Sequence, residues 1–174
     1  APGGRLGIPG SRQHSRNPAG KGTASSCAAP RRAVSAMAGK GGVTVVKVGA
    51  AKMLFARGFL RRVFEIFEEN GISIDVVATS EVSVSMTVDD PSGLESLVVG
   101  LSQLGDVSVE RDRAIVAVVG AAISEDSGSM GRAIGALEGI KVHMMSLSAT
   151  GINLTIIVDG DQLNPAMDRL HNAF

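Results

Sequence analysis

The strongest constraint on the fold of this chain is an internal repeat. The segment from Gly58 to Asp89 recurs, with weaker similarity, about 70 residues later in the 174-residue sequence. The matching positions are Gly58 and Arg62 with Gly128 and Arg132, Ile74 and Asp75 with Val142 and His143, and Val82–Asp89 with Ile152–Asp159. A repeat of this size indicates one supersecondary unit used twice, so the two copies have to be interpreted together.

The first copy is predicted to contain four strands and two helices. A strand at 43–48 precedes a helix at 58–70, two strands at 72–78 and 82–88, a second helix, and a strand at 107–110. The second helix follows Asp90 and Pro91, which suit a cap and a first helical position. The first helix ends at Gly71 and has one apolar face, formed by Phe59, Leu60, Val63, Phe64 and Phe67.

This order of elements, β-α-β-β-α-β, predicts an α+β fold of two ferredoxin-like modules, each with two helices on one face of an antiparallel sheet. The second copy begins with a strand at 114–119 and ends with a helix at 161–171, one strand short. We expect a strand at 34–38 to fill that edge, because open edges are a liability. The first module is then inserted within the second. The predicted segments are 1–32 (linker), 33–42 (completing strand), 43–111 (first module) and 112–174 (second module).

Composition argues against several classes of protein. The 17 basic and 17 acidic residues give zero net charge, and aromatic residues make up 3% of the chain, so neither an electrostatic footprint nor a stacking platform for nucleic acid is present. Apolar runs such as 114–119 are too short to cross a membrane. A single cysteine, Cys27, forms no internal disulfide and suits a reducing compartment. We expect a soluble intracellular protein.

The first 32 residues differ from the rest. They contain no acidic residue, five arginines and many Gly, Pro, Ser and Ala residues. This composition is typical of an organellar transit peptide, and a loop or linker is the alternative.

The first copy contains Met53-Leu54, Arg57–Leu60, Val63-Phe64, Ile72–Asp75 and Thr79–Ser83, and the second ends in Leu170-His171 and Phe174. Through these residues the two copies resemble the first and second of the tandem regulatory ACT domains of aspartate kinases. The resemblance implies the nested arrangement. It also implies that 1–32 is the tail of a kinase domain and its linker, because Pro2, Ile8-Pro9, Asn17-Pro18 and Gly22-Thr23 have the family's spacing, although Gly10–Arg12 lacks the apolar residues expected of a strand there.

We expect no catalytic residue, metal site or cofactor in this chain. The Lys-Phe-Gly-Gly-Thr motif of the family's catalytic domain does not occur. Gly20–Thr23 and Gly39–Gly42 lack the preceding strand and following helix of a phosphate loop. The histidines, His14, His143 and His171, are predicted in a linker, a strand and a terminal helix. The resemblance implies that ATP and Mg are bound by the rest of a parent enzyme.

A ligand site is predicted in the first module. The loop 52–57 leads into a helix N-terminus, where amides and the helix dipole favour a carboxylate, and Asp75 on the next strand suits an ammonium group. The resemblance implies an effector site for lysine, with threonine or S-adenosylmethionine as other effectors, formed by Met53, Gly58, Phe59, Leu60, Ile74, Asp75, Val76, Ser80, Glu81 and Val82. Ala56 stands where relatives often carry Ser, which removes one side-chain hydrogen bond.

These residues also have structural interpretations. Phe59 and Leu60 suit a core, and Thr79–Glu81 suits a hairpin turn. Asp75, in an apolar run, is either exposed or paired, and pairing is favoured. His143 replaces Asp75 in the second copy and cannot receive a cation in the same way, which leaves Asn153 as the best polar candidate for a second site.

The resulting expectation is an amino-acid-sensing regulatory region of an aspartate kinase that is inhibited by lysine and forms a homodimer through its ACT modules. The first module senses and the second holds the pair together. The alternative is a non-catalytic structural subunit that binds no effector. The sequence of the first copy most resembles plant-type members of the family, which favours the plastid stroma over the cytoplasm. No nucleic-acid or membrane partner is expected.

Overall fold

The computed structural model describes residues 10–12, 23–25, 34–50, 57–120, 123, 127–148 and 151–174. The chain divides into two units, Ala1–Arg31 and Arg32–Phe174. In the first unit, β1 (Gly10–Arg12) pairs antiparallel with β2 (Thr23–Ser25). β1 is therefore a strand without the apolar residues expected of it, because the backbone ladder requires no particular side chain.

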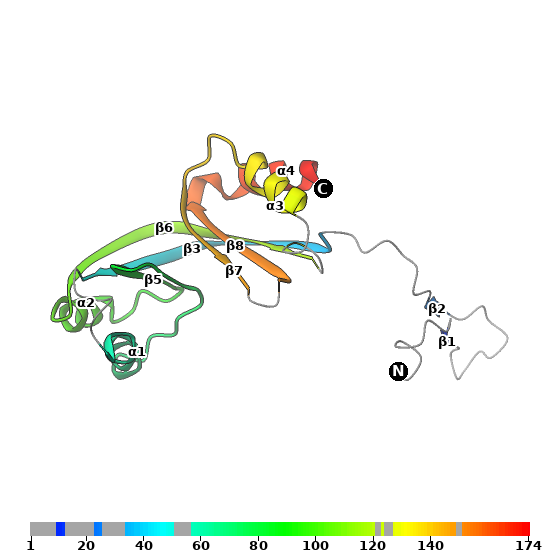
Figure 1. The fold of residues 1–174 in the computed structure, drawn as a ribbon. Coiled ribbons are helices and arrows are strands. Elements are labelled where there is room, and N and C mark those ends of the chain that lie inside the picture. The colour runs from blue at the N-terminus through cyan, green and yellow to red at the C-terminus, as the bar shows by residue number, and fades with distance from the viewer. Residues whose placement is uncertain are drawn as a thin grey trace. The chain divides into compact units, whose positions relative to one another are not determined.

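Two long antiparallel strands, β3 (Ala36–Gly49) and β6 (Asp106–Val119), run side by side through the second unit (Figure 1). The sequence predicted two shorter strands in place of each, and this was wrong. The glycines after Ala38 do not end β3, because the extra residues are absorbed as shifts of register between Lys40 and Val45. Both modules therefore share the same two strands.

The six-stranded sheet has the order β4-β5-β3-β6-β8-β7. In the first module β5 (Ser83–Val88) pairs with the second half of β3, and β4 (Val77–Thr79) pairs with β5. In the second module β8 (Asn153–Asp159) pairs with the second half of β6, and β7 (Val142–Leu147) pairs with β8. The first half of β3 lies at the other side of β6 and completes the second module. The prediction that the first module is inserted within the second is confirmed.

In the described part of the chain, each module has two α-helices. α1 (Phe59–Glu69) and α2 (Leu94–Ser102) belong to the first, and α3 (Ser127–Ala136) and α4 (Leu163–Ala173), the latter preceded by a 3-10 turn at Gly160–Gln162, belong to the second. In the described part of the chain, no helix has the length and apolar character needed to span a membrane.

The start of α2 differs from the prediction. The Asp90 carboxylate accepts a hydrogen bond from the Ser92 amide at 2.9 Å, and the residue before the first helical one is Gly93, with φ of 79°. Asp90 thus closes a turn, and Pro91 is not the first helical residue. The assignment of Asp90 and Pro91 as cap and first position was wrong, because the local turn uses the carboxylate before the helix begins.

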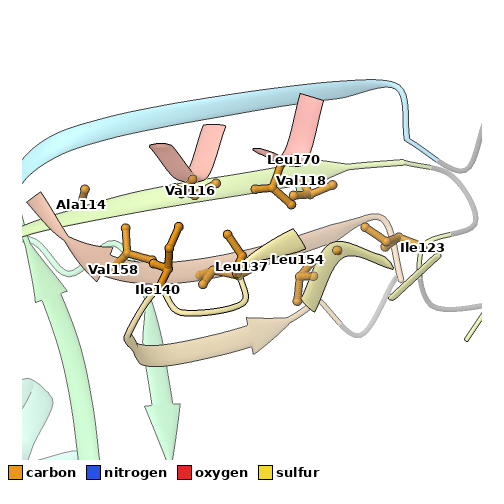
Figure 2. Packing of buried hydrophobic residues seen from close by; sticks show 12 residues of the cluster. Ala114, Val116, Val118, Ile123, Leu137, Ile140, Leu154, Val158 and Leu170 are labelled. Carbon is orange, nitrogen blue, oxygen red and sulfur yellow. The ribbon is translucent and has the colours of Figure 1, made fainter. Parts of the chain in front are cut away.

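Three clusters of buried residues hold the unit together. The helices of the first module cover Val46, Val48, Val84, Met86 and Val88 of the sheet. Figure 2 shows the equivalent core of the second module, where β6, β8 and α4 meet around Val116, Val118, Leu154 and Leu170. On the opposite face of the sheet a third cluster forms around Val45, Met144 and Ile157, and there β4 and β7 contact each other.

β4 is shorter than the predicted strand at 72–78. The Thr87 hydroxyl accepts a hydrogen bond from the Val76 amide at 2.9 Å, and Thr87 O accepts one from the Asp75 amide at 3.0 Å. Ile157, which stands at the position of Thr87 in the second module, has no hydroxyl, and there β7 already begins at Val142, with a shift of register between Val142 and Met144. The irregular segment before β4 leaves the Asp75 side chain exposed.

The two modules are related by an approximate twofold repeat. Thr44 pairs with Val88 in the first module, and Ala114 pairs with Val158, each 70 residues later, in the second. Within the central pair of strands, Lys40 pairs with Ile115, and their equivalents in the other module, Glu110 and Val45, pair with each other. The repeat in the sequence is therefore a repeat of register, and equivalent positions can be compared directly.

Candidate functional site

The turn between β4 and β5 contains three of the predicted ligand contacts, Ser80, Glu81 and Val82. Val82 O accepts a hydrogen bond from the Ala50 amide at 2.9 Å, which places the turn beside the end of β3. The Ser80 amide donates to Ser83 O at 2.8 Å, and the two serine hydroxyls lie 2.8 Å apart. Ser80 therefore stabilises a hairpin turn, as the structural interpretation of this segment describes.

The start of α1 contains three more of the predicted ligand contacts, Gly58, Phe59 and Leu60. Gly58 has φ of 82° and is the residue before the helix, and no side chain of the described residues caps it. The first-turn amides there are oriented as an anion requires. Phe59 packs partly buried against the core, whereas Leu60 is exposed. Met53 lies outside the described residues.

Asp75 lies beside a cavity of about 330 Å³. Its Oδ2 atom is 3.3 Å from Lys40 Nζ, and Lys40 also contacts the carboxylate of Asp89. The hydrogen bond that Lys40 donates to the Asp89 carboxylate lowers the pKa of Asp89 and raises the pKa of Lys40. The cavity is lined by Asn70, Gly71, Ile72, Ser73, Asp75, Asp89, Asp90 and Ser92.

The predicted contacts of the first module do not lie at one place within a single chain. Asp75 pairs across to Thr87 of β5, whereas Ser80 pairs to Ser83 at the far end of that strand. Four residues of strand separate the two levels, about 13 Å. Ile74 and Val76, on either side of Asp75, pack into the helix-side cluster and the third cluster respectively.

His143, the equivalent of Asp75 in the second module, is held between two carboxylates. Its Nδ1 atom lies 3.0 Å from Glu110 Oε2 and its Nε2 atom 2.9 Å from Asp159 Oδ1, and the side chain is 6% exposed. Arg113 contacts the same two carboxylates, at 3.2 and 2.8 Å. Both imidazole contacts are hydrogen bonds only when both nitrogens carry protons. The bond to His143 is the main cause that lowers the pKa of Asp159.

Asn153, the candidate for a second site, begins β8. Its Oδ1 atom is buried and has no hydrogen-bond partner among the residues that the structure describes. An unsatisfied buried carbonyl oxygen is consistent with a ligand contact, and this role remains a prediction.

Sequence reasoning missed Lys40, Asp89, Glu110 and Arg113. Asp89 and Asp159 close matched segments of the repeat, which was a usable signal. Lys40 lies in the glycine-rich stretch and was considered only as part of a phosphate loop. Its contact with Asp75 depends on the register of β3, which the repeat alone does not specify. Within the described ranges, no group of three or more His, Cys, Asp or Glu side chains could hold a metal ion.

Comparisons with known proteins agree on one family. The ACT domain family model matches residues 116–174. Aspartokinase 1, chloroplastic, of Arabidopsis thaliana is 37% identical over 147 residues, which cover 78% of this chain and 26% of that protein. The chain thus spans about a quarter of the length of this curated relative.

Two solved structures are similar along most of this chain. A chain described as a C-terminal regulatory domain of aspartate kinase from Porphyromonas gingivalis W83 is 38% identical, with a TM-score of 0.70 over 79% of this chain and 95% of that one. Aspartokinase III of Escherichia coli in complex with lysine and aspartate is 32% identical, with a TM-score of 0.70 over 98% of this chain and 40% of that one. The likeness to aspartate kinases therefore covers both modules.

Proposed function

The chain belongs to the aspartokinase family, as a C-terminal regulatory region built from tandem ACT domains, and we propose that its first module senses lysine for an aspartate kinase. The parent enzyme transfers a phosphoryl group from ATP, with Mg, to the side-chain carboxylate of aspartate. Lysine bound to the regulatory region inhibits that reaction. Threonine and S-adenosylmethionine are the other candidate effectors.

The observation that carries this proposal is the position of Asp75. It lies beside a cavity, and its carboxylate already receives one ammonium group, that of Lys40. Lysine supplies the same group at the end of a flexible side chain, and its α-carboxylate suits the uncapped start of α1. The related E. coli enzyme has been solved in complex with lysine, which supports the same class of effector here.

The separation of about 13 Å between the levels of Asp75 and Ser80 supports a site shared by two chains. Among the described strands, β4 is hydrogen-bonded to β5 alone. A second copy packed against this edge brings its own helix start and turn near Asp75. We therefore propose a homodimer through the ACT modules, whose arrangement the effector changes with a coupling of about 1 to 3 kcal/mol.

The plastid is the compartment we propose. The Arabidopsis relative is named as chloroplastic, and the resemblance of the first copy to plant-type members of the family supports the same compartment. The cytoplasm is the alternative, because bacterial aspartokinases are also similar to this chain.

The competing proposal is a structural subunit without effector binding. It is favoured by the ion pair of Asp75 and by the use of the Ser80 hydroxyl within its own turn. On this proposal the two modules serve only to join chains.

Isothermal titration calorimetry with lysine, threonine and S-adenosylmethionine separates the two. We expect heat with lysine for the wild-type chain, a loss of at least about tenfold in affinity for Asp75→Asn, since a hydrogen bond between charged groups is removed, and no change for Asp168→Asn, an exposed residue of α4. No heat with any of the three ligands would exclude sensing by this region, and an intact dimer in sedimentation would then favour the structural role.

A further inference from the structure

We propose that Lys40 is an affinity-determining residue of the first module's effector site: its ammonium group competes with that of the effector for Asp75 and has to be displaced. This inference rests on the proposed function. It concerns a residue that lies outside the segment where the ligand contacts were predicted, 35 positions before Asp75 along the chain.

The contact between Lys40 and Asp75 is a property of the fold, because the equivalent residues of the second module are also in contact. Glu110 is equivalent to Lys40 by the register of β3 and β6. His143 is equivalent to Asp75, because each immediately precedes the residue opposite Ile157 or its equivalent, Thr87. Glu110 contacts His143 at 3.0 Å, as Lys40 contacts Asp75 at 3.3 Å. The same strand position therefore reaches the same site in both modules, although the side chains and their charges differ. A chance contact of one flexible lysine would not recur in this way.

The partners of the carboxylates differ between the two clusters. In the second module Glu110 and Asp159 each contact both the Arg113 guanidinium and the His143 imidazole. In the first module two carboxylates, Asp75 and Asp89, share Lys40 alone among the described side chains. One carboxylate there is in excess, so an effector ammonium can take Asp75 while Lys40 remains with Asp89.

The exposure of the groups makes this exchange feasible. The Lys40 side chain is 51% exposed and that of Asp75 is 36% exposed. A partly solvated ion pair is weak, because water screens it and both side chains lose freedom. In the second module the equivalent His143 is nearly buried and engaged on both sides. The first cluster can open at small cost, whereas the second cannot.

The position of Lys40 also links binding to the rest of the unit. Lys40 lies on the half of β3 that completes the second module, where it pairs with Ile115 of β6. Asp75 lies just before β4 and Asp89 just after β5, both in the first module. Displacing Lys40 from Asp75 therefore changes an ion pair between the modules at the strands that they share.

The test is calorimetric titration of lysine into the chain and its Lys40→Gln variant, which removes the competing charge. We expect Lys40→Gln to bind lysine about threefold to fivefold more tightly, the range that an exposed ion pair allows. Lys47→Gln is the matched control, because Lys47 is an exposed residue of the same strand, and it should bind as the wild type does. Thermal unfolding checks that both variants are folded.

The outcomes separate this inference from the proposed function. Tighter binding by Lys40→Gln alone, or binding by Lys40→Gln where the wild type shows none, supports competition. Equal or weaker binding by Lys40→Gln, with a wild type that binds, overturns the role of Lys40 and leaves lysine sensing in place. If neither protein binds lysine, both the sensing proposal and this inference fail.

Discussion

Gly42 of β3 and Asp112 of β6 occupy equivalent positions, and both have a positive φ, 75° and 55° respectively. The register between the two strands shifts at this point, between Lys40 and Val45. A residue with a Cβ atom is strained in this conformation, which glycine adopts freely and aspartate at a moderate cost. The two modules are therefore joined by a matched pair of irregularities.

The first prediction concerns Gly42. Gly42→Ala should lower the free energy of unfolding by about 1 kcal/mol through backbone strain alone, because an added Cβ atom meets nothing within 4 Å. Gly135→Ala is the control: it also meets nothing within 4 Å but lies in α3, where alanine is favoured by about 1 kcal/mol. Urea denaturation should show a lower free energy of unfolding for Gly42→Ala and a higher one for Gly135→Ala. A neutral Gly42→Ala would contradict the strain.

The second prediction concerns the close approach of Gly105 to β3. An added Cβ atom at Gly105 would lie 2.2 Å from the carbonyl oxygen of Gly49. Backbone cannot move aside as a side chain does, so Gly105→Ala should cost about 2 to 3 kcal/mol. Gly41→Ala meets only the Leu163 side chain, at an ordinary 3.6 Å, and should change stability by less than about 1 kcal/mol. Equal melting temperatures for the two variants would refute the difference.

The third prediction is that the stability of the fold decreases at acidic pH. The pKa of Asp159 is lowered from its ordinary 3.8, first by the hydrogen bond to His143. The folded protein therefore binds this proton less readily than the unfolded chain does. The stability from Asp159 is fully present above the ordinary pKa and is lost as the pH falls through the lowered one.

Replacing His143 should make this loss smaller. We expect the free energy of unfolding to fall less between about pH 5 and about pH 3 in His143→Gln than in the wild type, although the variant is less stable throughout. His171→Gln, which alters an exposed histidine of α4, should keep the wild-type slope. Urea titrations across this range measure the slopes, and a His143→Gln slope equal to that of the wild type would rule out the linkage.

The repeat, the order of elements and the nested modules could be predicted from the sequence because each depends on local periodicity. The continuity of β3 could not, since three glycines within four residues usually indicate a break. Backbone pairing with β6 on one side overrides that local signal, and the surplus residues appear as shifts of register.

The candidate site was predicted in part for a similar reason. Asp75 is conspicuous locally, as an acid among apolar residues, whereas its partner Lys40 is distant in the sequence and is placed by strand register. The face of α1 was also misjudged. Val63 and Phe67 of the predicted apolar face are buried, but Leu60 and Phe64 are exposed, and Ile66, which was left out of that face, is buried. The apolar residues of α1 extend beyond the stripe of the helix that faces the core.

The exposed residues of α1 lead to the last prediction, on the homodimer. Leu60 and Phe64 are 37% and 40% exposed and lie four residues apart, on one face of the helix. This face adjoins the helix start that we propose binds the effector carboxylate, so a second copy that completes the site would also cover it. Phe64 is already partly buried in the single chain, so covering the rest contributes about 0.6 to 1.2 kcal/mol in each of the two chains of a symmetric dimer. Phe64→Ser should therefore weaken dimerisation at least about tenfold, as measured by sedimentation equilibrium.

Val99→Ser, which changes a residue of α2 that is 67% exposed, should leave the dimer dissociation constant unchanged, because α2 takes no part in the proposed contact. An undiminished dimer in Phe64→Ser would place the interface elsewhere on the modules.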